Sequence, residues 1–181
     1  MNRFIKDAIF GAIGGVAGTF VIKKTMELVS ELQSQEDKEI EKRLMKELPH
    51  EKLARVIVEY GLGIEITDET KFTLGTVVQW GYGISWGAAY GILRKEFPQV
   101  AKAGGLPFGV GLALLGPAVL LPLFNLSPGA HRLPLSAHAR GLVSHYAYAA
   151  AVQGVCEIGD ALEESVAHHP GQTKPEFRRI S

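Results

Sequence analysis

Cysteine is almost missing from this chain, since Cys156 is the only one among 181 residues. A single cysteine cannot form an internal disulfide. The sequence also lacks a CxxC pair and any cluster of histidine and cysteine with the spacing of zinc ligands. We therefore expect a fold that depends neither on disulfide bonds nor on a bound metal.

The chain also lacks net charge, with 19 acidic and 19 basic side chains. Its lysines and arginines form no cluster of the kind that follows a phosphate backbone. This balance argues against nucleic acid as a partner.

Charge is missing locally as well. Residues 72–93 and 106–124 contain no Asp, Glu, Lys, Arg or His, whereas charged side chains are concentrated between residues 23 and 71. As a helix, the 22 residues of 72–93 would rise about 33 Å, which matches a hydrocarbon core of about 30 Å. A soluble domain of this size rarely surrounds such a helix on every side. The pattern therefore predicts membrane-spanning helices.

Glycine is abundant within these apolar stretches and recurs every four residues. It costs about 1 kcal/mol against alanine in a water-exposed helix, but in lipid small residues at this spacing let two helices approach closely. We expect seven glycines to be helix-packing positions: Gly11, Gly15, Gly14, Gly18, Gly83, Gly87 and Gly91.

Taken together, these patterns predict an all-α fold, a polytopic membrane bundle of about four transmembrane helices with a helical extramembrane arm. Lys23 and Lys24 stand where a signal peptide would need small residues, so the N-terminal segment is predicted to be a retained anchor. We expect a single membrane domain over 1–166 and a flexible tail over 167–181. The predicted spans are about 5–25, 72–93, 105–124 and 135–158, and the arm is 26–70.

Two of the predicted spans are irregular in sequence. The third carries Pro107, Pro117 and Pro122, so a kinked or broken helix is expected there. The fourth is interrupted by His138, Arg140 and His145, and whether it crosses completely stays open.

The arm is predicted to begin with one long helix over 26–48, which continues from the first span and ends before Pro49. Its leucines suggest a weak oligomeric seam. A short amphipathic helix over 53–60 follows, and Thr67 or Asp68 is expected to cap the next span. At the opposite side of the bundle, Lys6 and Glu157 are close enough in the expected topology to pair.

Polar residues inside the predicted spans are few. His138 and His145 would project from one helix face two turns apart, where they could bind haem or a quinone. The competing interpretation is that His145 bonds a neighbouring helix and His138 lies at the interface. Ser85 occupies a G-x-S-x-G string, but that motif requires a strand-to-helix turn, so we interpret the match as accidental and predict no enzyme activity.

Three stretches resemble the YagU-like bacterial inner-membrane proteins, a small family of unknown function. They are GAIGGVAGT in the first span, EKLARVIVEYGLGIEIT before the second, and WGYGISWGAAYG at 80–91. The resemblance implies a multi-pass protein of the bacterial inner membrane. Gln79 stands where the family pattern often has a histidine, and no catalytic residue is carried over.

The functional expectation is a non-enzymatic membrane protein that acts by helix–helix association, as a homo-oligomer or as an accessory subunit of a membrane complex. One alternative is an oligomeric channel or transporter. The other is a redox subunit that binds haem or a quinone through His138 and His145.

Overall fold

The computed structural model describes residues 2–167, which are largely helical and include no β-strand. Helical bounds follow the sequence signals at several ends. Thr67, one of the two predicted caps, accepts a hydrogen bond from the backbone N–H of Thr70 and starts the fourth α-helix. The elements are α1 (Arg3–Glu31), α2 (Gln35–Leu44), α3 (Pro49–Arg55), the π-helix η1 (Val56–Gly61), α4 (Asp68–Glu96), the 3₁₀-helix η2 (Pro98–Ala101), α5 (Lys102–Ala113), the π-helix η3 (Leu114–Leu120), α6 (Leu121–Leu123), the 3₁₀-helix η4 (Ala130–Arg132) and α7 (Leu135–Ala167).

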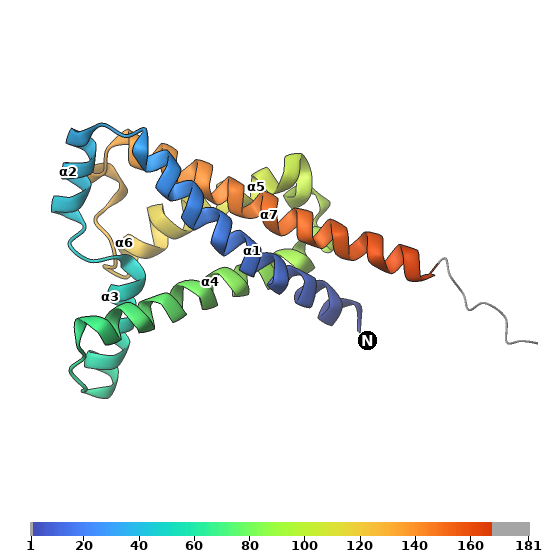
Figure 1. The fold of residues 1–181 in the computed structure, drawn as a ribbon, viewed down its shortest axis with the longest axis horizontal. Helices are drawn as coiled ribbons and strands as arrows, with labels where there is room; N and C mark the ends of the chain where they lie inside the picture. Colours follow the sequence, from blue (N-terminus) through green and yellow to red (C-terminus); the bar gives the residue numbers. More distant parts are fainter. Residues whose placement is uncertain (1, 168–181) are drawn as a thin grey trace, which may run out of the picture.

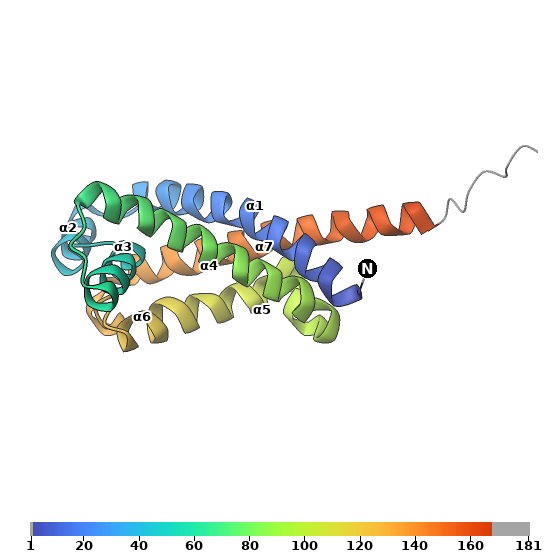
Figure 2. The same ribbon diagram turned by 90° about the horizontal axis from the view of Figure 1, so that it is seen from below.

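Four long elements run back and forth along the molecule: α1, α4, the α5–η3–α6 segment and α7 (Figure 1). Helix α1 lies between α4 and α7 and makes its most extensive contacts with both, while α5 packs on α7. Figure 2 shows α2 and α3 at one end of this bundle and the N-terminus with the α4–α5 connection at the other.

Within the described residues, two segments are long and apolar enough to cross a membrane, Arg3–Glu31 and Pro98–Leu123. Helices α4 and α7 have sufficient length, at 29 and 33 residues, but are less apolar. Glycine, tyrosine and glutamine dilute α4, and histidine, arginine and glutamine dilute α7. The all-helical fold is confirmed, and membrane crossing is supported for two segments by length and composition alone.

The single helix predicted over 26–48 is wrong. Helix α1 ends at Glu31, and the chain turns at 32–34 before α2 begins at Gln35. Ser34 stops the continuation because its side chain accepts a hydrogen bond from the backbone N–H of Asp37 and so caps a new helix. The turn also separates Leu28 and Leu32 from the later leucines, which removes the predicted continuous seam.

The proline-containing third segment is irregular, as predicted. Ala103, Gly104 and Gly105 have positive φ angles of 49°, 67° and 82°, so the chain bends sharply before α5 proceeds. Around Pro117 the helix widens into the π-helical turns of η3. Proline has no backbone N–H to donate within a helix, and the wider turns accommodate the missing hydrogen bond.

Candidate functional site

The closest contact in the molecule is the seam between α1 and α4, built from backbone rather than side chains. A Cβ atom at Gly87 would lie 2.4 Å from the carbonyl oxygen of Gly11, and one at Gly91 would lie 2.0 Å from that of Asp7. At Gly83 it would lie 2.1 Å from the Oγ1 atom of Thr19. No side chain fits at these positions unless the two helices move apart.

The second glycine line of α1 faces α7. A Cβ atom at Gly14 would lie 3.0 Å from Val152, and one at Gly18 would lie 2.6 Å from the ring of Tyr148. The Tyr148 hydroxyl donates a hydrogen bond of 2.5 Å to the carbonyl oxygen of Gly83 and thereby ties α7 to α4. Helix α1 is therefore packed through both of its glycine lines within one chain.

Helix α4 presents an aromatic face next to its glycine face. The Tyr90 and Trp86 rings lie 4.7 and 6.2 Å from the Phe108 ring on α5, and Tyr82 stacks edge-on against Trp86 at 6.0 Å. These rings bridge α4 to α5, a pair whose backbones make few contacts.

A third line of small residues on α4, made by Gly81 and Ser85, contacts no other helix of the described chain. Gly81 and Ser85 are exposed, and a Cβ atom at Gly81 would find no atom within 4 Å. Ser85 lies in the middle of the continuous helix α4, so the strand-to-helix turn that would make it a nucleophile is not present at this position. This line is a helix face of small residues without a partner in the described chain.

The two candidate cofactor residues both bond to backbone carbonyls. Nδ1 of half-buried His145 lies 2.7 Å from the Gly141 oxygen, and Nε2 of exposed His138 lies 2.9 Å from the Ala130 oxygen. Helices α1, α4 and the α5–η3–α6 segment carry no histidine, so none of the other proposed spans offers an axial ligand to face His145 across a haem. Within residues 2–167, no three His, Cys, Asp or Glu side chains gather as a metal site.

Charged residues join α4 to α7 at the N-terminal end of the bundle. Arg94, nearly buried, donates hydrogen bonds of 2.9 and 2.8 Å to the Asp160 carboxylate and one of 3.2 Å to the Cys156 carbonyl oxygen. Lys95 adds a bond of 2.9 Å to Asp160. Three residues beyond Asp160 on α7, Glu163 pairs with Lys6 of α1 at 2.7 Å.

The sequence left a Lys6–Glu157 pair possible, but Lys6 pairs with Glu163 instead. Glu157 instead accepts a hydrogen bond from Gln153 on its own helix, and Gln153 in turn accepts one from the Tyr90 hydroxyl at 2.5 Å. Because α7 continues as a helix beyond the predicted boundary at 158, it carries Glu163 out to the level of Lys6.

At the opposite end, a polar cluster ties the start of α2 to α7. Arg140 donates to Gln33 and to the buried carboxylate of Glu41. The Gln33 amide also donates to Glu41 and, at 3.0 Å, to the Ser136 hydroxyl. In the sequence, Arg140 only interrupts an apolar segment. In the structure it attaches the 32–34 turn and α2 to α7.

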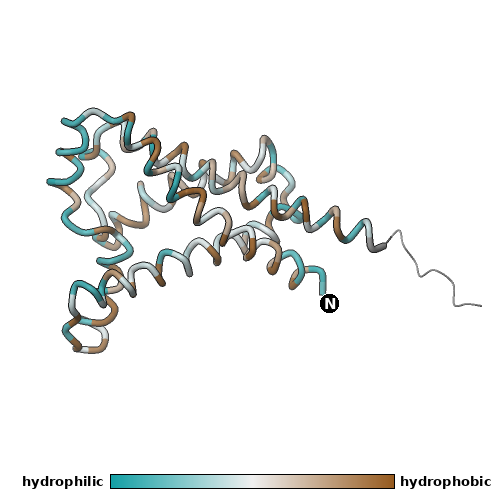
Figure 3. The backbone as a smooth tube through the Cα atoms, viewed as in Figure 1, coloured by the Kyte–Doolittle hydropathy of each residue, from teal (hydrophilic) through white to brown (hydrophobic). Residues whose placement is uncertain are grey.

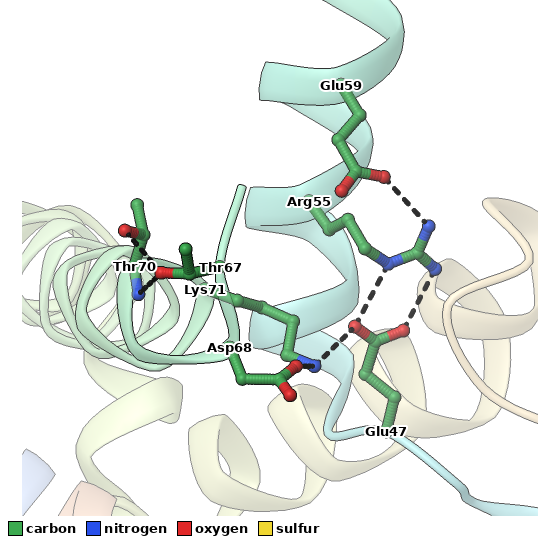
Figure 4. A network of polar contacts seen from close by, with 7 residues as sticks. All are labelled: Glu47, Arg55, Glu59, Thr67, Asp68, Thr70 and Lys71. Atoms are coloured by element: carbon green, nitrogen blue, oxygen red, sulfur yellow. Dashed lines mark hydrogen bonds and ion pairs between the residues drawn. The ribbon is translucent and has the colours of Figure 1, made fainter. Parts of the chain in front are cut away.

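A third cluster joins α3 and η1 to the start of α4 (Figure 4). Arg55 donates two hydrogen bonds of 3.1 and 3.0 Å to the Glu47 carboxylate and one of 3.4 Å to that of Glu59. Lys71 lies 2.8 Å from Asp68 and 3.8 Å from Glu47. Hydrogen bonds from Arg55 hold the pKa of the Glu47 carboxyl below its usual value. Sequence reasoning missed this cluster, although the i, i+4 spacing of Arg55 and Glu59 indicates one of its pairs.

Comparisons with protein-family models, with curated proteins and with solved structures find no match to this chain. Its function must be argued from the surfaces just described.

Proposed function

We propose that this chain is a multi-pass membrane protein in which α1, α4, the α5–η3–α6 segment and α7 are four spans. Support comes from large apolar side chains that stay exposed along all four elements. Figure 3 shows apolar residues spread along these elements, whereas α2 is mostly hydrophilic. Water penalises such exposure, whereas lipid does not. These side chains include Ile5, Ile9, Ile13, Phe20, Phe72, Val77, Leu114, Leu115, Val119, Leu123, Leu142 and Val143.

Within that membrane domain, we propose that the protein acts by association with a second copy or with another membrane subunit, and not by catalysis. The observation that carries this proposal is the uncovered Gly81–Ser85 line on α4. Small residues at this spacing permit close approach of a second helix. The seven glycines predicted for packing are occupied within the chain, so association requires a different face. We also propose the bacterial inner membrane as its location, which is what the resemblance to YagU-like proteins implies.

Two substitutions on one helix test the proposal. Native mass spectrometry of the protein released from membranes is expected to report a homo-oligomer or a co-purifying subunit. Gly81→Leu is expected to abolish that assembly while leaving the helical content and thermal unfolding of the chain unchanged, because the added side chain meets no atom of its own fold. Gly87→Leu is the matched comparison, since it disrupts the fold itself. A monomer without any partner in the unmodified protein, or an assembly that survives Gly81→Leu, would contradict association through this face.

A further inference from the structure

The corner formed by α3 and η1 has an orientation that differs from the rest of the molecule. The two elements follow each other without a gap over Pro49–Gly61, and Figure 1 shows them running across the direction of α1, α4 and α7. On its inner side this corner packs against α4, where a Cβ atom at Gly75 would lie 3.0 Å from the Cα atom of Glu51. A helix placed in this way is parallel to a membrane that the long helices cross.

Arg55 and Glu59 of this corner form ion pairs within the chain. Arg55 is bound to Glu47 and Glu59, and Lys71 is bound to Asp68 and lies near Glu47. Figure 4 shows these groups gathered between the corner and the start of α4. Such mutual neutralisation lowers the cost of bringing this part of the chain to a low-dielectric boundary.

The apolar side chains of the same corner are left uncovered. Ile57, Tyr60, Leu62 and Ile64 are 52%, 79%, 68% and 55% exposed, and Phe72 at the entry of α4 is 63% exposed. Phe72 begins the apolar stretch 72–93 of α4, and the polar residues 65–71 separate it from Ile64 in the chain. These apolar side chains lie at the end of the proposed span, where lipid headgroups meet the hydrocarbon core.

We propose that the segment 57–64 rests in the headgroup–acyl boundary of the bilayer as an interfacial anchor. An amphipathic helix lying in the membrane plane buries its apolar side chains to a depth of about 5–10 Å, and a tyrosine is suited to that zone because its ring is apolar and its hydroxyl is polar. The inference rests on the proposed function, because it requires α4 to cross the same membrane. Its consequence is that the start of α4 is fixed in depth and in tilt by lipid as well as by α3.

Spin labels at three positions test this anchor in the full-length protein reconstituted in liposomes of zwitterionic and anionic phospholipid. The background is Cys156→Ala, which removes the single cysteine, and the labelled variants are Leu62→Cys on the corner, Val77→Cys on α4 and Lys42→Cys on α2. Val77 is 63% exposed on a proposed span, and Lys42 is exposed on the charged arm. Power saturation compares access of molecular oxygen, which concentrates in lipid, with access of a water-soluble nickel chelate.

The expected result is a ratio of oxygen to nickel access at residue 62 that is several-fold above the ratio at residue 42 and below that at residue 77. A ratio at 62 equal to that at 42, with residue 77 in lipid, overturns the anchor and leaves the membrane assignment intact. A label at 62 shielded from both reagents also overturns it and indicates a protein partner on the corner. If residue 77 is itself in water, the membrane proposal fails, and the anchor fails with it.

Discussion

The two halves of α4 are held by different forces. Its C-terminal half contacts α1 through Gly87 and Gly91, where backbones touch, and through Gly83, which faces the Thr19 side chain. Its N-terminal half is held by close packing of α3 at Gly75 and by the charged cluster around Arg55. The helices α1 and α4 lie close at the glycines and separate toward the charged end (Figure 1). The contact with α1 depends on shape, whereas the N-terminal attachment depends on ionisation as well as on packing.

The difference teaches where this fold tolerates change. Backbone contacts between glycines have no soft side chain that can adjust, so an added methyl group must displace a helix. Ion pairs with partly exposed side chains can exchange partners or water at small cost. Mutations in the glycine half should therefore cause large losses in the free energy of unfolding. Mutations in the charged half should cause small losses that depend on pH.

The largest expected effect is that of Gly87→Leu. The new side chain would begin within 2.4 to 2.6 Å of backbone atoms of Gly11 and Gly15, and we expect a loss of more than about 3 kcal/mol, at or above the usual upper range for overpacking. Thermal unfolding in detergent followed by circular dichroism measures it. Gly81→Leu on the same helix serves as the control and should lie within about 0.5 kcal/mol of the unmodified protein, as is usual for surface positions. Equal effects at the two positions would refute the distinction between the seam and the open face.

Arg94→Met is expected to have an intermediate effect of about 1–3 kcal/mol. It removes the bidentate grip on Asp160 and the bond to the Cys156 carbonyl, but Lys95 still neutralises Asp160, so the loss falls below that of a fully isolated buried charge. Arg94→Lys keeps the charge without the fork of the guanidinium group and should recover part of the stability. Chemical unfolding of both variants in detergent provides the measurement. No difference between them would show that geometry at Asp160 is unimportant.

The smallest expected effect is that of Arg55→Gln, about 0.5–1 kcal/mol, because both partners of the Glu47 pair remain partly accessible. Its pH dependence is more informative than its size. The folded-state pKa of Glu47 is lowered, chiefly by its hydrogen bonds from Arg55. The stability from this pair is therefore fully present above the unfolded-state pKa near 4.5 and is lost as the pH falls through the lower folded-state value.

Amide hydrogen exchange in residues 49–66, measured from pH 7 to below pH 4, follows that loss locally after correction for the intrinsic exchange rate. The unmodified protein should keep its protection in this corner above about pH 4.5 and lose it as the pH falls through the lowered pKa of Glu47, while Arg55→Gln should show weak protection throughout. The seam at Gly83–Gly87 should change little over the same range, since the residues that it contacts, Gly11, Gly15 and Thr19, carry no charge. A seam that loosens together with the corner would contradict the division of α4 into two independently held halves.

Local signals predicted much of the helical outline. Thr67 capped α4, prolines disturbed the third segment, and charge-free stretches became long helices, because each depends on neighbours within a few residues. The same local reasoning failed at 32–34, where a serine cap and the reach of Arg140 from α7 together favour a turn over a continuous helix.

The sequence alone does not predict which helix covers each glycine line. Spacing predicts that Gly83, Gly87 and Gly91 share a face, but which helix covers that face is decided by contacts between residues from 64 (Thr19 to Gly83) to 84 (Asp7 to Gly91) positions apart. Small residues that meet another helix and small residues that remain open have the same spacing in the chain. Gly81 and Gly87 are told apart only when the neighbours are in place.

The central position of α1 has a consequence for how the protein is made. Helix α1 is synthesised before the helices that cover its two glycine lines, which begin at Asp68 and Leu135. Both sides of α1 are therefore protected only after α7 has emerged. Until then α1 offers an open glycine line to other helices, so, in the proposed membrane domain, its residence time with chaperones and insertion machinery should depend on the synthesis of residues far downstream.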